Sequence, residues 1–215
     1  MLTPTRTPAH ELLDEHDAPQ ADMERSLRDL RWINKYWGGV AIYRSLVRRF
    51  APRSILDLGA GTADLLDSVA HVPLRIALDF KIDHLLYERH RSRALRVVGD
   101  ATRLPFRDNA VELITSAHFF HHFSPEENIG ILKEALRVTS KGVAVNDTRR
   151  HYAPLAFILL VSALRIVGRI TRYDGPASVR QGYTIAEARG IAGQTGAKWA
   201  VVRKFPFRLA ILLWK

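Results

Sequence analysis

The sequence lacks cysteine, and it has no long apolar run. Disulfide bonds, thiolate metal ligands and cysteine nucleophiles are therefore excluded. The longest apolar stretch, residues 153–164, is too short to span a bilayer, which needs about 20 residues. The first twenty residues are polar, contain proline and lack the apolar centre of a signal peptide. We expect residues 1–21 to form a disordered tail, and we expect the protein to be cytoplasmic.

Acidic residues are scarce relative to basic ones. The chain carries 22 Asp and Glu against 32 Lys and Arg, which gives a net charge of +10. Such an excess is typical of proteins with an anionic partner, such as nucleic acid, a membrane surface or an acidic substrate. The arginines are scattered rather than grouped in blocks, which favours a general compositional bias over a basic binding surface. The oligomeric state is left unknown by these features.

The sequence predicts two helices in the first ordered part of the chain. Residues 22–37 carry apolar side chains at helical spacing, and Gly38-Gly39 interrupts that pattern. A second helical stretch follows and ends before Pro52. Because both helices precede the first strand signal, we interpret residues 22–52 as an N-terminal helical cap.

From Ser54 onward, short apolar strands alternate with helices. This alternation predicts a parallel sheet with right-handed crossovers. The last two strands lie close together on either side of Pro206-Phe207, which predicts an antiparallel hairpin at the sheet edge. The prediction for residues 53–215 is an α/β domain with a seven-stranded, mostly parallel sheet, helices on both faces and an antiparallel C-terminal hairpin.

Three acidic residues each follow or end a predicted strand: Asp57, Asp79 and Asp100. In open α/β sheets ligands bind at the carboxyl ends of the strands, and an acid about 20 residues after the first strand binds ribose hydroxyls in nucleotide sites. The turn Gly59-Ala60-Gly61 follows Asp57 and lets the backbone approach a ligand closely. Together these residues predict a nucleotide-type site.

The turn does not suit a dinucleotide. Asp64 stands where the dinucleotide fingerprint has its third glycine, and its carboxylate would repel a pyrophosphate. The acid at Asp57 suits a ligand that carries an ammonium group. S-adenosylmethionine has an amino acid head, a ribose and an adenine but no phosphate, so it fits both features.

Three stretches of the chain resemble motifs of the class I S-adenosylmethionine-dependent methyltransferases, in the branch that includes the ubiquinone/menaquinone type and many small-molecule enzymes. They are "ILDLGAGTADLL", "ALDF" and "GDATRLPFRDNAVELI", within residues 54–145. One departure is Ala63, where the family has a third glycine. The resemblance implies a Rossmann-like fold with S-adenosylmethionine as cofactor. The cofactor-binding residues that it implies are Asp57, Gly59, Ala60, Gly61, Asp79, Phe80, Asp100, Ala101, Ser116 and Ala117.

In this family the substrate half is formed by the N-terminal cap and by the segment after the fifth strand, here a helical insert at residues 148–183. We expect a helix over Tyr152–Arg172. It would either cover an apolar substrate pocket, with peripheral contact to a membrane surface, or pack in the core and expose a stripe of basic residues to solvent. A loop after it would return residues to the pocket. The predicted substrate residues are Tyr36, His118, Arg180 and Tyr183.

The stretch "SAHFFHHF" places three histidines after the fourth strand. A zinc site needs several converging ligands, and neighbouring His121 and His122 are not expected to point at one ion, so we predict no metal. A histidine is suited to accept a proton from a phenol or enol near neutral pH. The candidate catalytic residues are His121 or His122, with Asp147 as a second candidate base; packing or substrate shaping is the alternative role.

The sequence therefore predicts a methyltransferase of secondary metabolism that acts on a small, apolar or aromatic molecule. The reaction would be SN2 methyl transfer, as phenol or enol O-methylation or as C-methylation of a polyketide- or quinone-like compound. The alternative is an RNA or other nucleic-acid methyltransferase. That alternative is disfavoured because no Asn-Pro-Pro-Tyr-like motif follows the fourth strand and no cysteine is present to attack a base. A nucleotide-binding protein without catalysis, or a dehydrogenase, is a third hypothesis.

Overall fold

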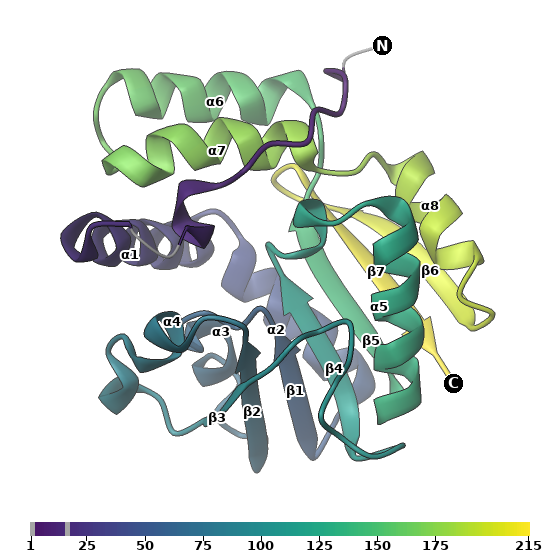
Figure 1. Ribbon diagram of the computed structural model, residues 1–215. Coiled ribbons are helices and arrows are strands. Elements are labelled where there is room, and N and C mark those ends of the chain that lie inside the picture. The colour runs from purple at the N-terminus through teal and green to yellow at the C-terminus, as the bar shows by residue number, and fades with distance from the viewer. Residues whose placement is uncertain (1–2, 16–17) are drawn as a thin grey trace.

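The computed structural model describes residues 3–15 and 18–215 (Figure 1). Its centre is one seven-stranded sheet with the strand order β3-β2-β1-β4-β5-β7-β6. Pairings among the first five strands are parallel, whereas β7 runs antiparallel to both β5 and β6. The strands are β1 (Ser54–Leu58), β2 (Leu74–Asp79), β3 (Leu95–Val98), β4 (Val111–Ala117), β5 (Thr139–Thr148), β6 (Lys198–Lys204) and β7 (Arg208–Trp214). The predicted sheet is confirmed.

Helices cover both faces of the sheet, because successive strand side chains point to opposite sides. On one face, Leu56 and Leu58 pack with residues of α5 (Pro125–Val138) and α8 (Ile185–Gly193). On the other, Ile55 packs with residues of α2 (Gly39–Phe50) and α3 (Asp64–Asp67). The short helix α4 (Ile82–Leu86) and the turn η2 (Arg89–Arg91) connect β2 to β3. Thus α2, which the sequence assigned to a cap, forms part of the sheet domain.

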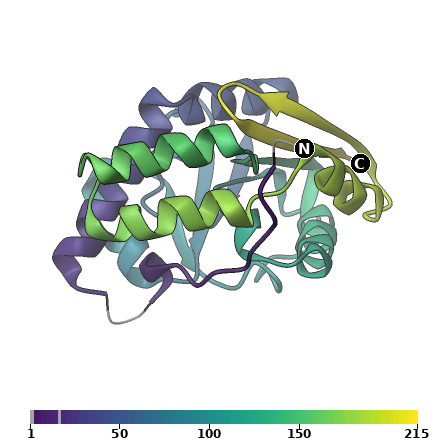
Figure 2. The same ribbon diagram turned by 90° about the horizontal axis from the view of Figure 1, so that it is seen from above.

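The remaining helices gather beyond the carboxyl ends of the parallel strands (Figures 1 and 2). They are α1 (Gln20–Tyr36), α6 (Tyr152–Ala163) and α7 (Arg169–Gln181). Asp29 of α1 accepts a hydrogen bond from the Gly168 backbone N–H at 2.7 Å, which ties α1 to the start of α7. A Cβ at Gly175 would lie 2.6 Å from Ile158, so the glycine allows α6 and α7 to approach closely. These helices form a roof above the strand ends.

The roof differs from its predicted form. The expected single helix Tyr152–Arg172 is interrupted after Ala163 by a turn in which Arg165 has a φ of 53°. Arg165 therefore does not share a helix face with Arg169 and Arg172, which belong to α7. The expected loop at 174–184 is mostly helical, since α7 runs to Gln181 despite the internal Pro176. The apolar pattern of the sequence did not reveal this helix, because the side of α7 that is buried includes polar residues.

The expected disordered tail also differs from the structure. Within it, η1 (Leu12–Asp14) and its flanks lie along α7, as both ribbon views show (Figures 1 and 2). The backbone N–H groups of Leu12 and Leu13 donate to the Asp174 carboxylate at 2.8 and 3.0 Å. Arg6 donates to the Phe123 carbonyl at 2.8 Å. These polar anchors, rather than apolar burial, hold the segment, so hydropathy did not reveal it. Residues 1–2 and 16–17 of the expected tail lie outside the described residues.

No helix within residues 3–15 and 18–215 combines the length and apolar character needed to cross a membrane.

Candidate active site

The loop after β1 is hydrogen-bonded to the end of β2. Gly59 and Gly61 have φ values of 64° and 51°, in the left-handed region that glycine adopts without strain. A Cβ at Gly59 would lie 2.3 Å from the Phe119 ring, so only glycine fits there. The Gly61 N–H donates to the Asp79 carboxylate at 2.9 Å. The turn therefore holds its backbone close to the carboxyl ends of β1 and β2.

The three strand-end acids surround one cavity of about 500 Å³. Both Asp79 oxygens accept backbone hydrogen bonds, from Gly61 and from Lys81, each at 2.9 Å. Asp100 is exposed and accepts from the Thr102 N–H at 2.8 Å. Asp57 is buried, and burial raises its pKa to about 7, against the effect of the Thr115 hydroxyl that donates to it at 2.6 Å. A ligand ammonium at this place would favour the charged carboxylate.

The cavity collects almost all of the predicted cofactor residues. Those that line it are Asp57, Gly59, Ala60, Gly61, Asp79, Phe80, Asp100, Ala101 and Ala117. Within the described chain the exception is Ser116, whose hydroxyl donates to the Leu58 carbonyl at 2.9 Å. Ser116 thus fastens β4 to β1 rather than facing the cavity.

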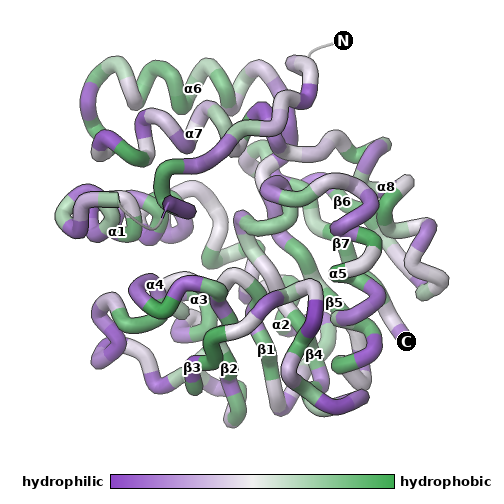
Figure 3. Tube along the Cα trace, viewed as in Figure 1, coloured by the Kyte–Doolittle hydropathy of each residue, from purple (hydrophilic) through white to green (hydrophobic). Residues whose placement is uncertain are grey.

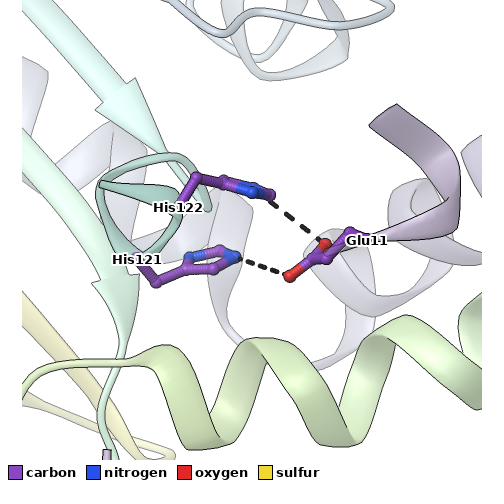
Figure 4. A group of neighbouring side chains, drawn as sticks. All are labelled: Glu11, His121 and His122. Carbon is purple, nitrogen blue, oxygen red and sulfur yellow. Dashed lines mark ion pairs between the residues drawn. The ribbon is translucent and has the colours of Figure 1, made fainter. Parts of the chain in front are cut away.

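The turn η3 (Phe120–His122) brings the predicted histidines to the same cavity. Nδ1 of His121 lies 2.7 Å from the Asp147 carboxylate, and its backbone N–H donates to the same group at 3.2 Å. On its other side, Nε2 of His121 lies 3.4 Å from Glu11 (Figure 4). His122 lies 4.0 Å from Glu11 through Nε2 and 3.2 Å from Asp14 through Nδ1. Two residues of the N-terminal segment therefore complete the cluster.

The two carboxylates beside His121 determine its charge. Burial alone would lower the pKa of His121, but Asp147 and Glu11 raise it to about 10. Burial would raise the pKa of Asp147, and His121 instead holds it well below its usual range. His121 is therefore an imidazolium at neutral pH, between two carboxylates. Asp147 has both oxygens engaged, by His121 and by the Thr148 N–H, so the geometry gives it an orienting role and does not support its predicted role as a base.

Glu11, His121 and His122 also form a group whose candidate ligand atoms lie within 4.8 Å of one another. Both histidine rings face the carboxylate of Glu11 (Figure 4). The centroids of the two rings are 4.3 Å apart, and their planes are tilted by 30°. The ion pairs described above account for the arrangement.

His118 lies where the main cavity meets a second one. Its φ is 53°, and Nδ1 lies 3.4 Å from the Thr148 hydroxyl. Nε2 is buried and has no hydrogen-bond partner among the described residues. Burial and the charge of Arg208 lower the pKa of His118 well below its usual value, so the ring is neutral. An unpartnered polar atom beside two cavities is a position for a ligand contact.

The second cavity has a volume of about 230 Å³ and lies between α1, α6 and α7. Its walls are mainly apolar and include Leu30, Ile33, Trp37, Phe157, Ile158, Val161, Val167 and Val179. It shares Glu11, Leu13, Leu30, His118 and Ser178 with the main cavity. The two cavities therefore adjoin, and His118 is the histidine that lies in the wall of both. The sequence did not identify Glu11, Leu13 and Ser178 as site residues, because the first two lie in the predicted disordered tail and Ser178 lies in a predicted loop.

The other predicted substrate residues lie elsewhere. Tyr36 is 62% exposed and packs beside Trp32. Arg180 is exposed on α7. The hydroxyl of Tyr183 is buried and donates to the Phe123 carbonyl at 2.5 Å, which anchors η3. As far as the described residues show, none of the three lines either cavity.

A mostly parallel sheet with an antiparallel last strand, and a cavity at its strand ends without a pyrophosphate-type turn, define a class I S-adenosylmethionine-dependent methyltransferase. Comparison with known proteins supports this assignment to the methyltransferases. Residues 56–145 match the methyltransferase domain family. A demethylmenaquinone methyltransferase of Mycobacterium sp. (strain KMS) is 31% identical in an alignment 163 residues long, and the alignment covers 69% of this chain and 68% of the relative.

Solved structures show the same fold. A SAM-dependent methyltransferase from Aquifex aeolicus matches with a TM-score of 0.63 at 16% identity, over 88% of this chain and 97% of its own. A plantazolicin methyltransferase in complex with a desmethyl substrate analogue and S-adenosylhomocysteine matches with a TM-score of 0.66 at 12% identity, over 89% and 90%. The chain belongs to the methyltransferase family that includes the demethylmenaquinone methyltransferases, and it is an enzyme that uses S-adenosylmethionine. The predicted fold, enzyme class and cofactor are confirmed.

Proposed function

We propose that this enzyme methylates a small aromatic acceptor of the quinol or phenol type that carries an apolar substituent. The observation that carries the proposal is that the two cavities adjoin and share His118 in their walls. The larger cavity has the cofactor residues, and the smaller one offers an apolar space. An aromatic ring at the junction would face the cofactor's methyl group while its substituent occupies the space between α1, α6 and α7.

The cofactor would be held by the strand ends. Asp57 suits its ammonium group, and Asp79 suits its ribose hydroxyls. Asp79 accepts hydrogen bonds from the Gly61 and Lys81 backbone, which fixes the orientation of its carboxylate. The adenine would lie between Phe80 and the Asp100-Ala101 backbone, which line the same cavity. S-adenosylmethionine supplies the electrophilic methyl group.

In the reaction a nucleophilic oxygen or ring carbon of the acceptor attacks the methyl carbon, and the C–S bond breaks to leave S-adenosylhomocysteine. The acceptor loses a proton in the same overall step. Alignment is the main contribution of such a site, with effects of roughly 7–11 kcal/mol in favourable cases. The His121 imidazolium would stabilise a developing phenolate or enolate. His122 is the candidate proton acceptor, and Asp147 holds His121 in place.

The name of the demethylmenaquinone methyltransferase relatives supports a quinone-like acceptor. The cavity walls support it independently, because a charged or strongly polar group would lose its hydration among Leu30, Phe157 and Val161. No feature of the site favours a nucleic acid.

The test is release of S-adenosylhomocysteine with a panel of reduced naphthoquinones and phenols, each with and without an apolar side chain, followed by mass spectrometry of the product. We expect turnover, with kcat/KM at least tenfold higher when the side chain is present. Val161→Trp should remove that preference by filling the smaller cavity, while turnover of the short acceptors remains. Exclusive methylation of polar acceptors or of RNA would overturn the proposal.

A further inference from the structure

Helix α6 is apolar on its inner and its outer side. Its inner residues Leu155, Ile158 and Val161 are buried in the roof. Its outer side carries Leu159, Leu160 and Leu164, which are 45%, 58% and 62% exposed. Ala156 and Ala163 are exposed on the same side at helical spacing, and Ile166 continues the surface into the turn. We call Ala156, Leu159, Leu160, Ala163, Leu164 and Ile166 the outer α6 face.

The outer α6 face is a continuous apolar surface on the outside of the molecule. The hydropathy colouring shows α6 as a mainly hydrophobic helix at the edge of the structure (Figure 3). Isolated exposed leucines are common on proteins, whereas a contiguous row of them marks an interaction surface. No other helix of the described chain covers it in either ribbon view (Figures 1 and 2).

The charged residues of the segment that contains α6 and the turn after it are all basic. The sequence contains no Asp or Glu between Thr148 and Tyr173. Arg165 and Arg169 are exposed at the turn that joins α6 to α7. Arg169 lies 3.6 Å from Asp22 of α1, and the Arg25 guanidinium donates to the Ile166 carbonyl at 3.1 Å. An apolar helix face bordered by arginines is typical of a helix that lies in the interface of an anionic bilayer.

We propose that the outer α6 face docks this enzyme on the surface of an anionic lipid bilayer. The leucines enter the boundary between headgroups and acyl chains, and Arg165 and Arg169 contact lipid phosphates. This is a helix lying on the membrane, in keeping with the absence of a helix that could cross one within the described chain. Charge complementarity favours an anionic lipid surface over a second copy of this chain, because two copies would bring their arginines together.

The docking helix is also a wall of the substrate space. Phe157, Ile158 and Val161 line the smaller cavity from the inner side of α6. An apolar acceptor that resides in a bilayer would then be separated from its cavity by one helix. This consequence for substrate delivery rests on the proposed function, whereas the docking itself does not.

The test is co-sedimentation of the purified full chain with vesicles of phosphatidylcholine alone or mixed with phosphatidylglycerol. We expect at least tenfold tighter binding to the anionic vesicles, and weaker binding as salt is raised. The double variant Leu160→Glu/Leu164→Glu should lose at least tenfold in vesicle affinity. Arg165→Gln/Arg169→Gln should lose affinity for anionic vesicles only. The matched control is Leu95→Glu, at a leucine that is 58% exposed on the edge strand β3, and it should bind as the unaltered protein does.

Equal affinity for both vesicle types, or unchanged binding by the double leucine variant, would overturn the proposal. So would a dimer in size-exclusion chromatography that the leucine variant converts to monomer without any vesicle binding, because the face would then join two copies. The leucine variant should retain its turnover of a water-soluble acceptor, since neither leucine lines a cavity. Loss of vesicle binding with retained turnover therefore tests docking separately from the proposed function.

Discussion

Replacement of Asp147 by asparagine should destabilise the protein in a pH-dependent way. The ordinary pKa of histidine is near 6.5, and in the folded chain the pKa of His121 is about 10. Each unit corresponds to about 1.4 kcal/mol, so the net effect of burial and the two carboxylates stabilises the charged form of His121 by roughly 5 kcal/mol. Asp147→Asn keeps the shape and one hydrogen bond but removes the nearer charge. Breaking a buried pair from one side costs about 3–5 kcal/mol, and we expect a loss of about 3 kcal/mol at pH 6.

The direction of the pH dependence follows from the raised pKa. A group whose pKa is higher in the folded state contributes its full stability below its unfolded pKa, here about 6.5, and loses that contribution as the pH rises through the folded value of about 10. The difference between Asp147→Asn and the unaltered protein should therefore shrink to under about 1 kcal/mol at pH 10.

The assay is urea unfolding followed by circular dichroism at pH 6, 8 and 10, with a nuclear magnetic resonance titration of the His121 ring. Asp108→Asn is a suitable control, because Asp108 is 71% exposed and pairs with Arg137 on the surface. Exposed pairs contribute at most about 1 kcal/mol, and this one should not change between pH 6 and pH 8. If Asp147→Asn cost the same at pH 6 and pH 10, the imidazolium between two carboxylates would be refuted.

Three other predictions concern the site itself. Asp79→Ala should weaken S-adenosylmethionine binding at least tenfold in isothermal titration, equal to about 1.4 kcal/mol, and an unchanged affinity would contradict the placement of the ribose. His121→Ala and His122→Ala should differ in kcat while both keep their cofactor affinity, and wild-type rates in both would exclude a catalytic histidine. Treatment with EDTA should leave kcat unchanged, because ion pairs account for Glu11, His121 and His122; loss of activity that Zn²⁺ restores would show that the cluster binds a metal.

The sheet could be predicted from the sequence because its signals are local. Each strand is a short apolar run, and the acids at Asp57, Asp79 and Asp100 follow three such runs in register. The Gly59-Ala60-Gly61 turn gains its meaning from its position directly after the first of these strands. The cofactor half of the site follows from these positions, since the carboxyl ends of parallel strands meet at one edge of a sheet.

The roof could not be predicted in the same way because polar contacts across the chain hold it. Asp174 is buried because it accepts two backbone hydrogen bonds from η1, and Gln181 donates to Glu11 at 3.0 Å. Neither residue carries an apolar signal that would mark a helix face. Arg180 appeared to face the pocket only because α7 was predicted as a loop. The partner of His121 likewise could not be inferred, since Glu11 lies more than a hundred residues earlier in the chain.

The position of Glu11 has a practical consequence for work with this enzyme. The first twenty residues look dispensable by composition, and a shortened protein that begins at α1 would be an obvious choice for expression. Such a protein would lose the carboxylate that faces both histidines, together with Leu13, which lines both cavities. It would keep the strand-end residues that are predicted to hold the cofactor, yet its acceptor side would be incomplete. Cofactor binding alone is therefore a misleading measure of whether a preparation of this enzyme is intact.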